Sequence, residues 1–198
     1  MPHAPIVLAS RSPRRSQLLA QIGVPHEVLA LDFDEARLPG EAPQAFVARL
    51  ARDKALHART TCPGGRLLLA ADTIVVLDGT IFGKPRDEPG ALGMLRALSG
   101  RCHEVMTAVA LCDGSDVRTA VNISRVTFRE LGEAECRAYW NTGEPADKAG
   151  AYAVQGLGAV FIERLEGSYS GVMGLPLFET ARLLQAAGAP VWQGEEPG

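Results

Sequence analysis

The 198-residue sequence lacks several features that would place it in particular classes of protein. No stretch approaches the roughly 20 consecutive apolar residues that a membrane helix needs. The segment Met1–Ala9 has no basic region followed by an apolar one, as a secretory signal would have. The net charge is −3 without a long block of one sign, which argues against a broad nucleic-acid-binding surface. We therefore expect a cytoplasmic protein that binds neither membranes nor nucleic acid.

Cysteine and histidine are too few and too scattered to indicate a zinc site or a disulfide framework. The sequence has 4 of each, with no Cys-x-x-Cys pair and no His-Glu-x-x-His pattern. Separated thiols suit a reducing compartment, in which we expect them to act as small apolar core residues.

What the sequence does contain is an alternation of strand-like and helix-like segments. Strands are predicted at 6–9, 26–31, 67–77, 80–82, 104–112, 117–128 and 159–165. Helices are predicted to begin at Pro13 and Pro43, to include Leu92 and Leu95 before ending at Gly100, and to span 133–141 and 176–187. We expect one α/β (mixed α+β) domain over residues 1–198, built on a twisted mixed β-sheet flanked by helices, with a polar tail at 193–198.

The segment Ser10-Arg-Ser-Pro-Arg-Arg15 has the chemistry of a phosphate-binding loop. A strand leads into two hydroxyls and then directly into a helix, whose first N–H groups and dipole favour an anion. Arg14 and Arg15 can each donate paired hydrogen bonds to phosphate. Basic residues at a positive helix end are unfavourable by themselves, so a bound anion would explain them. The alternative is a solvated basic helix start with Ser12 as its N-cap.

Asp72 follows five apolar residues, which makes it a second candidate. A buried carboxylate must be paired, capped or functional, because an unpaired buried charge is costly. If the sheet ends there, Asp72 projects into the crevice in which α/β sheets bind ligands. Capping a turn or pairing with an arginine is equally consistent with this feature alone.

Two lysines and two glycine-rich segments are weaker candidates for phosphate binding than the segment 10–15. Lys84 and Lys148 lie beside turn-forming residues, where a lysine can oppose phosphate charge or can simply be a surface residue. The glycine-rich segments 156–158 and 167–171 match neither a Walker A loop nor a dinucleotide-binding fingerprint.

Taken together in order and spacing, these segments resemble the Maf family over about residues 6–187. The matching segments are Leu8-Ala-Ser-Arg-Ser-Pro-Arg-Arg15, Ala71-Asp-Thr73, Gly83-Lys-Pro85, Leu98-Ser-Gly100, Glu144-Pro-Ala-Asp-Lys-Ala-Gly150, Gln155-Gly156 and Gly174-Leu-Pro-Leu177. The resemblance implies a nucleoside triphosphate pyrophosphatase, often a homodimer. It also implies a fold akin to that of the inosine triphosphate pyrophosphatases, with a cleft between two lobes.

The resemblance also implies roles for individual residues. Asp72 is the expected proton acceptor for the water that attacks phosphorus, and Glu35 is expected to help it hold a divalent cation, Mg²⁺ or Mn²⁺. Lys54 and Lys84 are expected to face the phosphates, and the loop residues Ser10, Arg14 and Arg15 to bind them. Cleavage between the α and β phosphates would release a monophosphate and pyrophosphate.

Three positions bear on the base that is recognised. Arg14, Thr73 and Gln155 match the branch of the family that acts on dTTP and UTP, whereas the 7-methyl-GTP branch tends to have Trp, Gln and Glu there. A neutral Gln amide can both donate and accept at a uracil or thymine edge. Arg11 and Met173 depart from the residues common in the branch, which leaves the catalytic assignment intact but bears on substrate preference.

The alternatives are a 7-methyl-GTP pyrophosphatase and a nucleotide-binding regulator of septum formation, a process with which the family has been linked. The presence of Glu35, Lys54, Asp72 and Lys84 together favours catalysis, because a binding module does not need a metal-ligating base.

Overall fold

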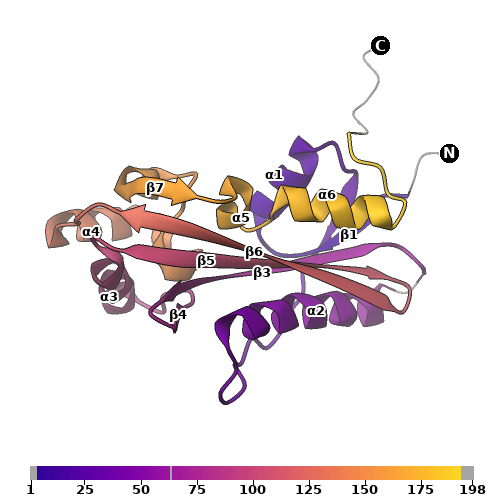
Figure 1. Cartoon of the computed structure of the whole chain (residues 1–198), viewed down its shortest axis with the longest axis horizontal. Coiled ribbons are helices and arrows are strands. Elements are labelled where there is room, and N and C mark those ends of the chain that lie inside the picture. The colour runs from indigo at the N-terminus through magenta and orange to yellow at the C-terminus, as the bar shows by residue number, and fades with distance from the viewer. Residues whose placement is uncertain (1–3, 63, 193–198) are drawn as a thin grey trace, which may run out of the picture. The chain divides into compact units, whose positions relative to one another are not determined.

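The computed structural model describes residues 4–62 and 64–192 and has a mixed α/β architecture (Figure 1). The strands are β1 (Ile6–Ala9), β2 (His26–Leu29), β3 (Leu68–Leu77), β4 (Thr80–Phe82), β5 (Cys102–Asp113), β6 (Asp116–Phe128) and β7 (Ile162–Glu166). The helices are α1 (Pro13–Gln21), α2 (Pro43–Thr61), α3 (Glu88–Leu98), α4 (Glu133–Trp140), α5 (Tyr169–Met173) and α6 (Leu177–Ala186), with short 3-10 turns η1 (Glu144–Asp147), η2 (Ala149–Ala151) and η3 (Leu157–Phe161). The sheet order is β2-β1-β3-β5-β6-β7, with β4 paired to β3, so the expected mixed sheet flanked by helices is confirmed.

The chain divides into two compact units, and the boundary passes through β3, β5 and β6. Unit 1 comprises the described residues up to Asp72, Thr107–Asn122, and the described residues from Gly174 onward. Unit 2 comprises Thr73–Met106 and Ile123–Met173. The expectation of one domain over residues 1–198 stays a prediction.

Unit 1 is built around β1, which pairs in parallel with β2 on one side and β3 on the other. All residues of β1 are buried, because α2 covers one face of these strands and α1 and α6 cover the other (Figure 1). A continuous apolar run is what a parallel strand buried on both faces requires. The helices start where the sequence predicts, with Pro13 and Pro43 at the first helical positions.

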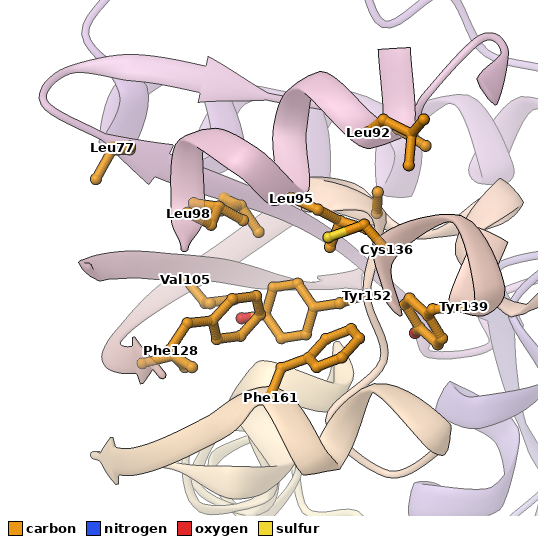
Figure 2. Close-up of a cluster of buried hydrophobic side chains, with 14 residues drawn as sticks. Leu77, Leu92, Leu95, Leu98, Val105, Phe128, Cys136, Tyr139, Tyr152 and Phe161 are labelled. Atoms are coloured by element: carbon orange, nitrogen blue, oxygen red, sulfur yellow. The ribbon is translucent and has the colours of Figure 1, made fainter. Parts of the chain in front are cut away.

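Unit 2 contains the antiparallel pairs β3–β4 and β6–β7. Asp78 and Gly79, with φ of 49° and 76°, form the turn between β3 and β4, because both central residues of such a tight hairpin need positive φ. The core of the unit is rich in aromatic rings, among them Phe128, Tyr152 and Phe161 (Figure 2). The leucines of α3, including Leu95, belong to the same buried cluster.

One expectation about these elements needs correction. The strand predicted at 159–165 begins only at Ile162, because the residues before it form η3. The strand predicted at 67–77 is confirmed as β3, and Asp72 lies inside it. Sequence patterns also gave no sign of α5 or of the 3-10 turns, which are too short to show a periodicity.

The expected tail at 193–198 lies outside the described residues. Among the helices of the described residues, none combines the length and apolarity that a membrane crossing requires.

Candidate active site

In unit 1, Ser10 ends the buried run of β1 and is itself only 7% exposed. Its Oγ accepts hydrogen bonds from the Ser12 backbone N–H at 3.1 Å and from Arg15 Nη1 at 3.3 Å. Ser12 occupies the N-cap of α1, but its side chain makes no capping hydrogen bond within the described residues. The start of α1 therefore lies beside a buried hydroxyl and a guanidinium, and the predicted binding of an anion there stays a prediction.

Arg15 is held on its other side by the carbonyl of Gly174, which accepts from Arg15 Nε at 2.7 Å. Burial lowers the pKa of Arg15, an effect that the nearby carboxylate of Asp72 opposes. Arginine is not deprotonated in proteins, so its guanidinium can only donate hydrogen bonds. Gly174 has a φ of 117°, which favours glycine. The sequence gives this glycine no role beyond its match to the family, because a backbone carbonyl leaves no side-chain signal.

Three of the predicted residues meet at a single ammonium group. Lys54 Nζ, on α2, lies 2.6 Å from Glu35 Oε1 and 2.6 Å from Asp72 Oδ1. The side chains of Lys54 and Asp72 are 12% and 9% exposed, whereas that of Glu35 is 48% exposed. Asp72 is therefore paired with Lys54, the charge of Arg15 also acts on it, and Lys54 with Asp72 forms the inner part of the cluster.

The electrostatic environment of Asp72 makes its carboxylate more basic than usual. Burial raises the pKa of Asp72, the charges of Lys54 and Arg15 oppose the rise, and the carboxylate of Glu35 adds to it. A proton acceptor for water benefits from such a shift, because an ordinary aspartate is a weak base near neutral pH.

The arrangement fits a divalent cation to the extent that two carboxylates converge on one point. Glu35 and Asp72 offer the hard oxygen atoms that Mg²⁺ and Mn²⁺ prefer. Within residues 4–62 and 64–192, no cluster of three or more His, Cys, Asp or Glu side chains could hold a metal. A cation here would thus take its remaining ligands from water and substrate, as Mg²⁺ commonly does at phosphate-processing sites.

The remaining predicted residues are placed as follows. Arg14 lies half-buried on α1, in unit 1. Thr73, Lys84 and Gln155 lie in unit 2, where Thr73 is half-buried in β3 and the other two are exposed.

Two of the segments matched to the family are joined inside unit 2. Gly150 N donates to Gly83 O at 3.0 Å, which fixes the backbone beside Lys84. Lys148, considered above as a phosphate-facing residue, donates to the carbonyl of Glu144 at 3.2 Å and pairs with Asp147. Lys148 therefore has a structural contact within its own segment.

A family model described as Maf-like protein matches residues 5–187 of the chain. The chain belongs to the Maf family. It is 52% identical over 197 residues to a protein of Saccharophagus degradans named dTTP/UTP pyrophosphatase, covering 98% of this chain and 94% of that one. A Methylococcus capsulatus protein of the same name is 54% identical over 183 residues, covering 92% and 91% of the two chains.

A solved structure with a weaker likeness to this Maf family member is the nucleoside-triphosphatase / dITP/XTP pyrophosphatase of Mycobacterium abscessus. It is 16% identical, covers 92% of this chain and 93% of that chain, and has a TM-score of 0.43. This likeness is too low to bear on residue roles. The expected kinship with inosine triphosphate pyrophosphatases and the expected cleft between two lobes stay predictions.

Proposed function

We propose that this Maf family member hydrolyses dTTP and UTP, and modified pyrimidine triphosphates, to the nucleoside monophosphate and pyrophosphate. The observation that carries the proposal is the convergence of Glu35 and Asp72 on Lys54. The names of the relatives that are 52% and 54% identical support the choice of substrate.

The phosphates would bind to the cationic side of unit 1. Arg14 and Arg15 lie in the first turn of α1, where the helix dipole adds to their positive charge. Arg15 is oriented by Ser10 and Gly174, so its guanidinium presents a fixed direction to the substrate. We expect Lys54 and Lys84 to add compact positive charges against the phosphates.

Asp72 would accept the proton of the attacking water. The oxygen of that water forms a new bond to phosphorus, the bond to the oxygen bridging the α and β phosphates breaks, and pyrophosphate leaves. The raised pKa of Asp72, caused by burial, suits a group that takes up and later releases this proton.

Glu35 and Asp72 would hold the divalent cation, Mg²⁺ or Mn²⁺. When bound, such a cation neutralises phosphate charge and makes a coordinated water more acidic. Glu35 is the more exposed of the two carboxylates. Its ion pair with Lys54 can then break, which frees the Lys54 ammonium to face the phosphates.

The base would be recognised by Gln155, with Thr73 and Arg14 as further determinants of specificity. The alternative substrate is 7-methyl-GTP, for which the residues at these three positions differ from those in this chain. The cytoplasmic location, the homodimer, and the absence of nucleic-acid and membrane partners stay predictions, as does the alternative role in septum formation.

The test is pyrophosphate release from a panel of dTTP, UTP, CTP, dATP, GTP and 7-methyl-GTP with Mg²⁺ or Mn²⁺. We expect turnover of dTTP and UTP that Asp72→Asn abolishes with the fold intact. Asp53→Asn is the matched control, since Asp53 lies on α2 and pairs with Arg49 at 3.6 Å. Preference for 7-methyl-GTP would refute the assignment of dTTP and UTP as substrates. Inactivity with both cations would favour the alternative role as a nucleotide-binding regulator of septum formation.

A further inference from the structure

The glycine-rich segment Gly156-Leu-Gly158 wraps around a carboxylate of the protein itself. Glu144 Oε2 accepts from Leu157 N at 2.9 Å, and Glu144 Oε1 accepts from Gly158 N at 3.0 Å. Glu144 is half-buried in η1, and the segment reaches it from η3. The backbone of this segment therefore binds an internal anion, which the sequence patterns alone left unassigned.

Tyr139, at the end of α4, completes this network from the other side. Its hydroxyl donates to Glu144 Oε1 at 2.6 Å and accepts from Ala153 N at 3.1 Å. The residue is only 5% exposed, and its ring packs edge-on against Phe161 with 5.0 Å between centroids (Figure 2). We call the pair of Tyr139 and Glu144 the clamp.

The clamp explains why both positions of the segment are glycine. A Cβ atom at position 156 would lie 2.0 Å from Glu144 Oε2, and one at position 158 would lie 2.6 Å from the Tyr139 hydroxyl. No side chain fits at such distances unless the clamp moves.

Gln155 lies between the two places at which the clamp holds the chain. Ala153, two residues before it, donates to Tyr139, whereas Leu157 and Gly158, two and three residues after it, donate to Glu144. A turn closed by Gly156 N and Ala153 O at 3.3 Å carries Gln155 outward, and its side chain is exposed. Bonds on both sides of an exposed residue fix where its side chain can reach.

We propose that the clamp is a specificity-determining device: Tyr139 and Glu144 are positioning residues that set the place of Gln155 and thereby the discrimination between uracil and cytosine. This inference rests on the proposed function, because it assumes that Gln155 contacts the base. An amide can discriminate these bases only if its donor and acceptor are held in register with the base edge.

The test compares base discrimination in four proteins: the parent, Tyr139→Phe, Gln155→Ala and the double variant. Tyr139→Phe removes both bonds of the hydroxyl but keeps the ring against Phe161, so the fold should survive. Glu144→Gln weakens the same hydrogen-bond network from the other residue of the clamp, because the glutamine amide places a donor where an acceptor is needed. Tyr169→Phe, at a tyrosine 51% exposed on α5, is the matched control.

The quantity measured is the ratio of kcat/KM for UTP to that for CTP. We expect Tyr139→Phe and Gln155→Ala each to lower this ratio roughly tenfold, about the worth of one misplaced hydrogen bond. In the double variant the two losses should not add, because both act through the same side chain. Hydrogen exchange at Leu157 and Gly158 should be faster in Tyr139→Phe and unchanged in Tyr169→Phe.

The outcomes separate the clamp from the proposed function. Faster exchange with an unchanged ratio would overturn the inference, since the clamp would then merely hold η3 in shape. Losses that add in the double variant would also overturn it. A parent that cleaves no pyrimidine triphosphate would overturn the proposed function, and the inference with it.

Discussion

His103, on β5, should make the protein lose stability between about pH 7 and pH 5, before most carboxylates titrate. The ring is 2% exposed and is surrounded by Phe128 and Tyr152, with ring centroids 5.0 Å and 5.5 Å away. His103 Nε2 lies 2.9 Å from the Tyr152 hydroxyl, but Nδ1 has no hydrogen-bond partner among the described residues. A charged ring would be poorly accommodated here, because both nitrogens would have to donate.

Burial lowers the pKa of His103 to about 4, and the backbone of Arg101 has a smaller effect in the opposite direction. In the unfolded chain the pKa is about 6.5, so between these values the unfolded state binds more protons and stability falls with falling pH. A difference of about 2.5 pKa units corresponds to about 3 kcal/mol in total, of which about 2 kcal/mol is lost between pH 7 and pH 5.

Urea unfolding at pH 7 and pH 5 measures this loss. His103→Gln should lower stability at pH 7 through poorer packing, yet its free energy of unfolding should change by about 2 kcal/mol less between the two pH values than that of the parent. His57→Gln, at an exposed histidine of α2, is the matched control. Equal pH dependence in the parent and His103→Gln would refute the reasoning.

The remaining predictions concern the two candidate clusters. Burial raises the pKa of Asp72 and Lys54 opposes that rise, so Lys54→Met should move the acid limb of the kcat–pH profile to higher pH; an unmoved limb would contradict this. Gly158→Ala should cost about 1–3 kcal/mol in thermal unfolding, because its Cβ would meet the Tyr139 hydroxyl, and Tyr139→Phe in the same background should recover part of it. The hydrogen bonds of Glu144 outweigh the burial that would raise its pKa and leave that pKa below its usual value. The Glu144 carboxylate therefore stabilises the fold above the pKa that it has in the unfolded chain, and this stabilisation is lost as the pH falls through its pKa in the folded protein. Glu144→Gln should thus destabilise the protein at pH 7 more than at pH 4.

Regular elements were predictable because their signals are local. Pro13 and Pro43 mark helix starts, and Asp78 with Gly79 marks a tight hairpin, so each feature follows from a few neighbouring residues. The strand predicted at 67–77 is confirmed as β3, and a carboxylate inside it is acceptable because Lys54 pairs with Asp72. That pairing joins residues 18 positions apart, which no local pattern reveals.

The members of the candidate site came from the resemblance, and their contacts came from the structure. Nothing in the spacing of Glu35, Lys54 and Asp72 indicates that two carboxylates share one ammonium. The role of Tyr139 was also invisible, because a buried tyrosine in a helix looks like an ordinary core residue. Its importance arises only where its hydroxyl meets Glu144.

The contact between Glu144 and Gly156 also constrains how this chain can evolve. At 2.0 Å from the carboxylate, a first methyl group at position 156 is excluded for as long as the glutamate stays. Replacement of the glutamate by a shorter residue would free position 156, at the cost of the bonds to Leu157 and Gly158. The two positions should therefore co-vary across the Maf family.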